Sequence, residues 1–269
     1  YMEEEFHNHM RIPWHDYTRK SIGRPITEAS LSEKASIIGR TGIMLLSCGT
    51  GAWRVRSSMN TLARELGITC TADIGLLSIE YTCIDGGNCY TESLCLFNTG
   101  VNTSKLYRME EFVNKFAGNC KKMSGDELHT LLDRIHEIHG FYSPPFLGLA
   151  AAVACCAFTF LLGGGPVEMF CAFLGAGAGN YLRAKMNQHH LTLFLCTAAS
   201  VALACIVYTI AFTALKSGFH VSIHHQAGYI CSMLFIIPGF PFITSGIDLA
   251  KLDMRSGLER LTYAIIIIS

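Results

Sequence analysis

Long apolar runs with few charged residues dominate the second half of the chain. Five such runs are separated by short polar stretches: Phe146–Leu162, Pro166–Leu182, Leu191–Leu215, Ala227–Leu249 and Leu258–Ile268. A helix that spans a bilayer needs about 20 apolar residues, so the first four runs qualify, although two of them are short. The fifth run stops at Ser269, and we expect its helix to be incomplete. The pattern predicts an all-α membrane domain of about five transmembrane helices over residues 144–269.

The first half of the chain begins with helical patterns. Ser30 and Glu33 have the spacing of a capping box, and they open an apolar helical pattern that continues to about Cys48. A second helix is predicted over Trp53–Leu66, where apolar residues recur at helical spacing. A second capping box opens a further helix over Ser124–Gly140. These signals indicate a folded domain with its own core.

Strand patterns lie between these helices. Three β-rich runs are Ile68–Ala72, Leu76–Ile84 and Cys89–Asn98, and the Asp-Gly-Gly-Asn sequence of Asp85–Asn88 is typical of a hairpin turn. One more helical pattern follows over Leu106–Phe116. The sequence predicts an N-terminal α+β domain over residues 30–143, preceded by a polar, flexible tail over residues 1–29.

Charge separates the two halves and suggests their orientation. Of 21 basic and 21 acidic residues, only ten lie beyond Phe146. Lys and Arg are retained on the cytoplasmic side of a membrane, and they occur after the second run (Arg183, Lys185) and after the fourth (Lys251). This pattern predicts a multi-pass protein of the cell (inner) membrane with a cytoplasmic N-terminal domain. A net charge of zero argues against nucleic acid as a partner, so the bilayer is the expected environment.

Catalytic signatures are missing from the sequence. No GxSxG, phosphate-loop or HExxH motif occurs, and the twelve cysteines form no CxxC pair. We therefore expect no enzyme activity and no cofactor or metal, with free thiols acting as small buried hydrophobes. A membrane-tethered hydrolase stays an alternative, although no nucleophile with its base can be named.

The most informative segment is a helix break inside the fourth apolar run. Pro238, Gly239, Phe240 and Pro241 follow one another there, and each proline removes an amide from the helical hydrogen-bond ladder. Broken backbone at membrane depth is tolerated where it lines a cavity or is buried in protein, and transporters use such breaks as binding sites. The break therefore predicts a transport site.

Polar residues around the break complete the candidate binding site. Thr244 and Ser245 could donate hydrogen bonds to a substrate carboxylate, and Asn180 could add a polar group from the glycine-rich second run. Asp248 is the ionisable residue nearest the break; it could couple transport to protons, recognise an amino group, or lie at the interface paired with Lys251. Close packing of helices is the simpler explanation for the glycines of the second run, because small residues let helix backbones approach closely in lipid.

Histidines prompt a different class of function. A metal-ion transporter or sensor is suggested by five of them: His189, His190, His220, His224 and His225. All five lie in predicted loops or interfaces, which makes this the alternative to carboxylate transport.

Several segments together resemble the threonine/serine exporter family in its two-component form. The resemblance covers the chain from about Ala35 onward. It depends on Gly51-Ala52-Trp53-Arg54-Val55, on Gly100-Val101-Asn102 and above all on the segment Ile237–Pro241, which leads to Asp248-Leu249 and Ser256–Arg260.

The resemblance implies a two-subunit exporter. Its members join a cytoplasmic N-terminal domain to about five spans and use a second membrane domain, which is either fused or a separate polypeptide. This chain is similar to the larger subunit, like those that export succinate or related small carboxylates. A second integral membrane subunit and an oligomeric assembly are therefore the expected partners, and the soluble half would act as a gate or assembly platform.

Overall fold

The computed structural model describes most of the chain. The described residues are 12–18, 23–97, 99–119, 122–138, 142–189, 191–219 and 226–268. They form two compact units, the first made of Tyr1–Gly140 with Phe240–Thr262 and the second of Phe141–Gly239 with Tyr263–Ser269. The first border lies close to the predicted start of the membrane domain at residue 144. Phe240–Thr262, which we had expected to belong to the membrane domain, is instead grouped with the N-terminal unit.

A three-stranded antiparallel sheet forms one layer of the first unit. Its strands are β1 (Thr69–Ile74), β2 (Ser78–Asp85) and β3 (Asn88–Cys95), in the order β1-β2-β3. The predicted hairpin turn is present between β2 and β3, where Gly86 and Gly87 have φ of +54° and +93°. Glycine tolerates such positive angles, which explains why this turn is readable from the sequence.

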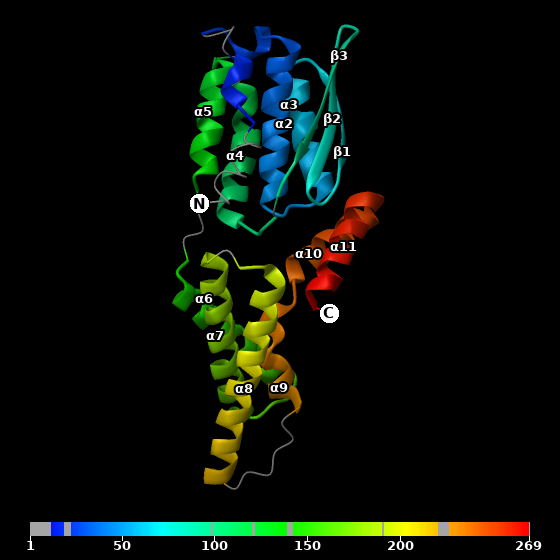
Figure 1. Ribbon diagram of the computed structural model, residues 1–269. Coiled ribbons are helices and arrows are strands. Elements are labelled where there is room, and N and C mark those ends of the chain that lie inside the picture. The colour runs from blue at the N-terminus through cyan, green and yellow to red at the C-terminus, as the bar shows by residue number, and fades with distance from the viewer. Residues whose placement is uncertain are drawn as a thin grey trace. The chain divides into compact units, whose positions relative to one another are not determined.

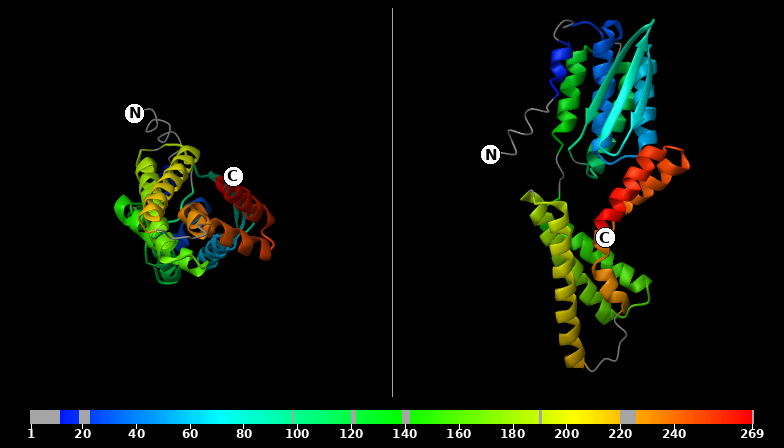
Figure 2. Two further views of the ribbon diagram at one scale, coloured as in Figure 1. Left: turned by 90° about the horizontal axis from the view of Figure 1, so that it is seen from below. Right: turned by 45° about the vertical axis from the view of Figure 1, so that its right-hand side comes forward.

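Four helices complete the N-terminal part of this unit (Figures 1 and 2). They are α2 (Leu31–Ser47), α3 (Ala52–Glu65), α4 (Thr103–Asn119) and α5 (Gly125–His136). Helices α2 and α3 lie between the sheet on one side and α4 and α5 on the other (Figure 1). Both predicted caps are confirmed: Ser30 Oγ accepts from the Glu33 amide, and Ser124 forms a complete capping box with Glu127.

Helix α2 is the centre of the first unit. Its residues from Glu33 to Leu46 are all buried. The helix and the sheet approach closely because Gly39 has no side chain: a Cβ there would lie 2.3 Å from Tyr81 Oη. The core is completed by apolar residues that are fully buried, among them Ile37, Ile38, Met59, Leu62, Ile79 and Phe116.

The described part of residues 1–29 packs against this core, which differs from the predicted flexible tail. It forms two 3-10 turns, η1 (Trp14–Thr18) and η2 (Ile26–Glu28). Ile26 is fully buried, and the Trp14 ring stacks on His129 at a centroid distance of 6.1 Å. Burial of these apolar side chains offsets the cost of ordering the backbone.

The second unit consists of packed apolar helices. They are α6 (Pro144–Leu161), α7 (Pro166–Gln188), α8 (Leu193–Phe219), α9 (Gln226–Ser232) and the 3-10 turn η3 (Leu234–Ile236). Glycines allow α7 to contact helices on two sides. A Cβ on Gly175 of α7 would lie 2.8 Å from Ala204 O of α8. A Cβ on Gly148 of α6 would lie 3.0 Å from Gly177 O of α7. The glycine-rich run of the second apolar segment thus packs helices together.

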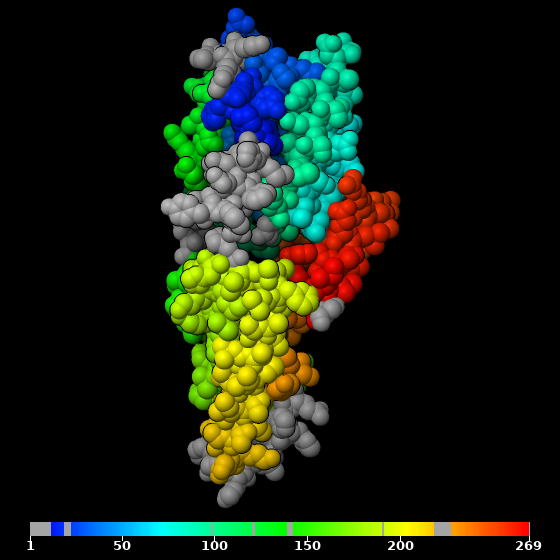
Figure 3. Space-filling view, viewed as in Figure 1, coloured from blue at the N-terminus to red at the C-terminus, as the bar shows by residue number. Residues whose placement is uncertain are grey.

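Two described helices are long and apolar enough to cross a membrane. They are Pro144–Leu161 and Leu193–Ser217, and the pair Ala227–Ile236 and Gly239–Ala250 would add a third if it forms one interrupted span. Large apolar side chains are exposed along α8, including Phe194, Ile206 and Ile210, and Figure 3 shows this helix (yellow) open along one face of its unit. These features fit a membrane protein, while the count of about five spans stays a prediction.

Candidate functional site

The helical run is interrupted where the prolines predict it. The turn η3 ends at Ile236, Ile237 is extended with ψ of 118°, and α10 (Gly239–Ala250) begins after Pro238. Pro238 cannot donate a backbone hydrogen bond, so it cannot continue the preceding turn. In the first turn of α10, the Gly239 amide bonds to Ile237 O, outside the helix, at 2.8 Å, and Pro241 has no amide. The amides of Phe240 and Phe242 therefore have no partner within their own helix.

The predicted hydroxyl groups after the break donate to the backbone. Thr244 Oγ1 lies 2.9 Å from Phe240 O, one turn back in α10. Ser245 Oγ donates to Gly257 O at 2.8 Å and so joins α10 to α11 (Met254–Ile268). Gly257 lets the two helices meet, because a Cβ there would lie 2.7 Å from Leu249.

Asp248 is fully buried and joins α10 to the first turn of α3. Its Oδ2 accepts from the Ala52 amide at 3.1 Å and from Ser256 Oγ at 3.0 Å. The residue that caps α3 is Gly51, which has no side chain to serve that role. Asp248 supplies the cap instead, and its negative charge meets the positive end of the α3 dipole.

Arg260 completes this cluster from α11. Its Nε lies 3.3 Å from Asp248 Oδ2, and its guanidinium donates to Gly49 O at 3.1 Å and Thr50 O at 2.8 Å. Only 2% of the residue is exposed. We call Ala52, Asp248, Ser256 and Arg260 the Asp248 cluster. It satisfies Oδ2 fully, whereas Asp248 Oδ1 is buried without a hydrogen-bond partner among the described residues.

The expected alternative, Asp248 paired with Lys251, is wrong. Lys251 follows the end of α10 and extends toward α3, where its Nζ lies 4.6 Å from the centroid of the Trp53 ring. Arg260 holds the position that Lys251 was expected to fill. The sequence offered one signal for this: Arg260 belongs to the segment that carries the family resemblance, yet its contact with Asp248 could not be read from spacing.

Further contacts attach α11 and the turn before it to the same unit. Arg56 donates to Asp253 at 2.5 Å, Glu259 Oε2 accepts from the Leu76 amide at 2.6 Å, and Arg255 pairs with Asp73. Sequence reasoning predicted no contact for Glu259, and it used Arg255 only as one of the basic residues that follow the fourth apolar run. These contacts place the helix pair α10–α11 firmly on α3 and the edge of the sheet.

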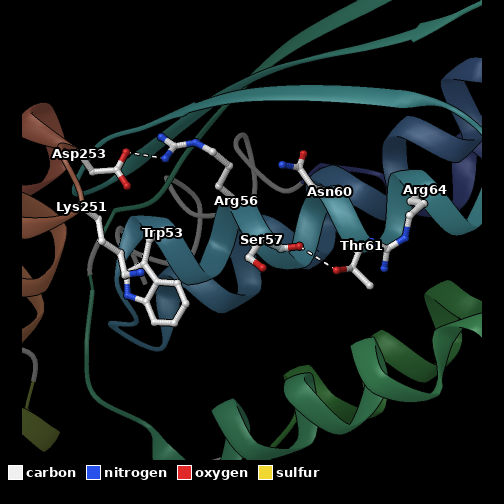
Figure 4. A pocket seen from close by; sticks show the side chains of 8 residues that line it. All are labelled: Trp53, Arg56, Ser57, Asn60, Thr61, Arg64, Lys251 and Asp253. Atoms are coloured by element: carbon white, nitrogen blue, oxygen red, sulfur yellow. Dashed lines mark hydrogen bonds and ion pairs between the residues drawn. The ribbon is translucent and has the colours of Figure 1, made fainter.

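A shallow polar cavity of about 540 Å³ lies beside this cluster. Figure 4 shows the residues that line it: Trp53, Arg56, Ser57, Asn60, Thr61, Arg64, Lys251 and Asp253. Three cationic side chains against one carboxylate give it a positive character, and Arg56 is already engaged by Asp253. The cavity could attract an anion from solvent.

The remaining predicted site residues are divided between the two units. Phe240 and Pro241 belong to the first unit, whereas Pro238, Gly239 and Asn180 belong to the second. Asn180 Nδ2 donates to Leu147 O at 2.8 Å, which ties α7 to α6. The structure therefore brings Thr244, Ser245 and Asp248 together on α10.

The histidine alternative lies mostly outside the described residues. His190, His220, His224 and His225 are among the residues that the structure does not describe, and His189 follows the last turn of α7. Within the described ranges, no group of three or more His, Cys, Asp or Glu side chains could hold a metal ion.

Comparison with known proteins identifies the family. The model of a family described as "Putative threonine/serine exporter" matches residues 36–269. The chain belongs to the threonine/serine exporter family. It is also 23% identical over 227 residues to the "Probable succinate transporter subunit YjjP" of Escherichia coli (strain K12), a match that covers 83% of this chain and 84% of that protein. No solved structure matches the chain.

Family membership and the apolar helices agree on a membrane transport protein. The expected resemblance is thereby confirmed over most of the chain. The Asp248 cluster and the interrupted helix both lie within the matched residues.

Proposed function

We propose that this protein is one subunit of a secondary exporter of small carboxylates, either threonine and serine or a C4-dicarboxylate such as succinate. The threonine/serine exporter family supports the amino acids, and the name of the related YjjP supports succinate and a multi-subunit assembly. The partner would be a second integral membrane subunit of the same family. Loop charges support a place in the cell (inner) membrane with the first unit in the cytoplasm.

The observation that carries this proposal is the interruption between Ile236 and Gly239. A helix that begins inside an apolar segment presents free amides and a partial positive charge, which suit a carboxylate. Pro238, Gly239, Phe240 and Pro241 would line the path of the substrate. Thr244, Ser245 and Asn180 would add polar atoms, because each hydroxyl or amide oxygen can still accept a hydrogen bond.

Asp248 would act indirectly at this site. Its carboxylate is held by Ala52, Ser256 and Arg260, so it positions α10 within the first unit. A substrate ammonium group would have to displace Arg260 to reach it.

Copurification followed by efflux tests the proposal. The tagged chain is extracted from a native membrane, and the proteins that copurify are identified by mass spectrometry. Cells that lack both chains are then supplied with this chain, with the copurifying membrane chain, or with both, and efflux of serine, threonine and succinate is measured. We expect efflux of at least one substrate only when both chains are present. Equal efflux by this chain alone would contradict the two-subunit assignment.

A further inference from the structure

Glu168 is a buried acid in the apolar second unit, and the proposed function leaves it without a role. It lies in the first turn of α7 and is 2% exposed. Its Oε2 accepts from the Gly165 amide at 2.8 Å, which caps the helix. Its Oε1 is buried and has no hydrogen-bond partner among the described residues. One oxygen of the carboxyl group is thus fixed and the other is vacant.

Three helices enclose this carboxyl group. Thr159 of α6 and Glu168 Oε2 both approach Gly164, where a Cβ would lie 2.5 Å from Thr159 Cγ2 and 3.0 Å from that oxygen. Gly228 of α9 lies between Glu168 and Tyr208 of α8, because a Cβ there would be 2.9 Å from Glu168 Cβ and 2.5 Å from Tyr208 Oη. Close packing of this kind excludes bulk water from the acid.

Among the described residues, the titratable groups that face Glu168 offer it no positive charge. Cys171 of α7 and Tyr208 of α8 interact with it electrostatically, and Cys231 of α9 interacts with Tyr208. No Lys, Arg or His among the described residues forms an ion pair with it, in contrast to Asp248, which has Arg260. Within the described residues, the dipole of α7 is the positive end that faces a Glu168 carboxylate. A carboxylate that is buried without a paired cation is costly, and in membrane proteins such acids often serve as proton relays.

We propose that Glu168 is the proton-binding residue that couples export to the proton gradient. A proton from water on the external side forms an O–H bond at the vacant Oε1, while Oε2 keeps its bond to Gly165. The same O–H bond breaks when the site opens to the cytoplasm, and the proton leaves to water there. One proton enters the cell for each substrate that leaves. This inference depends on the proposed function and adds to it the coupling ion and the residue that binds it.

The test separates exchange from gradient-driven transport. Inside-out vesicles carry the chain together with its copurifying subunit, and labelled succinate and threonine serve as probes. Exchange is measured with probe on both sides and no gradient; accumulation is measured with the vesicle lumen one pH unit more acidic than the bath. A gradient of one unit can drive at most about tenfold accumulation per proton exchanged. Wild type should show both exchange and accumulation. If wild type shows neither, the proposed function itself fails.

The decisive variant is Glu168→Gln. Its amide oxygen can still accept from Gly165, so the helix cap is kept, but the side chain can no longer bind and release a proton. We expect exchange close to wild type and accumulation reduced to equal concentrations inside and outside. Glu168→Asp, which stays ionisable, should recover part of the accumulation. Glu111→Gln, which removes a half-buried acid of α4 in the other unit, serves as the matched control and should change neither assay.

Three outcomes would overturn the inference. Glu168→Gln could keep full accumulation, which would mean that Glu168 acts only as a cap. The variant could lose exchange and accumulation together, which would indicate a structural role. Accumulation in wild type could follow a sodium gradient and ignore the pH gradient, which would exclude the proton as the coupling ion.

Discussion

Asp248 and Arg260 form the most enclosed ion pair of the first unit, with side-chain exposures of 0% and 3%. Their contacts link residues about 200 positions apart: Ala52 with Asp248, and Gly49 and Thr50 with Arg260. Removing one member of a buried pair leaves the other charge unsatisfied, which costs far more than the net contribution of the pair. The Asp248 cluster is therefore sensitive to single substitutions.

Stability measurements test this pair. Arg260→Met should lower the free energy of unfolding of the first unit by roughly 3–5 kcal/mol, the usual cost of an orphaned buried charge. Adding Asp248→Asn should recover part of that loss, because both charges are then gone. Urea unfolding in detergent measures both the loss and the recovery. It is followed by the fluorescence of Trp53 in a Trp14→Phe background. Lys115→Gln, at an exposed residue of α4, is the control. The loss of unfolding free energy in the double variant is compared with the sum of the losses in Arg260→Met and Asp248→Asn. If the two are equal, the two residues do not form a pair.

His15 gives the first unit a pH-dependent contact. Hydrogen bonds from its ring to Asp126 at 2.6 Å and to Asp133 at 2.8 Å raise the pKa of His15 above its ordinary value of 6.5. The contribution to stability is fully present below that value and is lost as pH rises through the raised pKa. His129 acts in the opposite sense, since burial and then Arg40 lower its pKa to about 3, and it destabilises the fold as pH falls below 6.5.

Comparison of wild type with His15→Asn isolates the contribution of His15 to the free energy of unfolding. The difference in unfolding free energy between wild type and His15→Asn should be largest below pH 6.5 and should decrease at higher pH. Urea unfolding at a series of pH values measures this difference. The comparison is repeated in a His129→Gln background, because His15 also lowers the pKa of His129 and the titration of that residue would otherwise differ between the two proteins. A difference that does not change with pH would show that His15 is not the titrating contact.

At the scale of elements, the interruption before α10 is the feature on which transport should depend. A proline inside a helix costs about 3 kcal/mol, and both Pro238 and Pro241 would lie inside a continuous helix, so the double variant Pro238→Ala/Pro241→Ala is needed to remove this cost. We expect helix content to rise slightly and efflux to be largely lost, because the free first turn of α10 disappears. Circular dichroism and the two-chain efflux assay measure the two effects.

Prolines at helix starts provide the control for this prediction. Pro144 occupies the first position of α6, where a proline removes no helical hydrogen bond. Pro144→Ala should leave helix content and efflux close to wild type. Full efflux by the double variant Pro238→Ala/Pro241→Ala, together with a rise in helix content, would contradict a role for the interruption in transport.

Local signals explain which elements could be predicted from the sequence. The caps at Ser30 and Ser124 and the turn at Gly86 and Gly87 depend on residues within a few positions of one another, so the sequence shows them directly. The cap that Asp248 gives to α3 comes from 196 residues away. Apolar character alone also assigned Phe240–Thr262 to the membrane domain, although its buried polar groups join it to the first unit.

At the scale of the whole molecule, the exposed surface of the second unit calls for an apolar environment. Side chains such as Phe160, Phe194 and Ile210 are more than half exposed, and soluble proteins rarely expose large contiguous apolar patches. We expect the protein to stay in the membrane pellet after an alkaline carbonate wash and to be released by detergent. Release by carbonate alone would contradict integral membrane insertion.

Reconstitution of the purified two-chain complex tests the central claim most directly. Proteoliposomes loaded with unlabelled succinate, threonine or serine are diluted into trace amounts of the same labelled compound, and uptake by counterflow is recorded. Transport of small carboxylates predicts a transient accumulation of label for at least one of the three, which is absent from liposomes that lack this chain. No accumulation of any of them by a complex that is folded and correctly inserted would contradict the assignment as a carboxylate exporter.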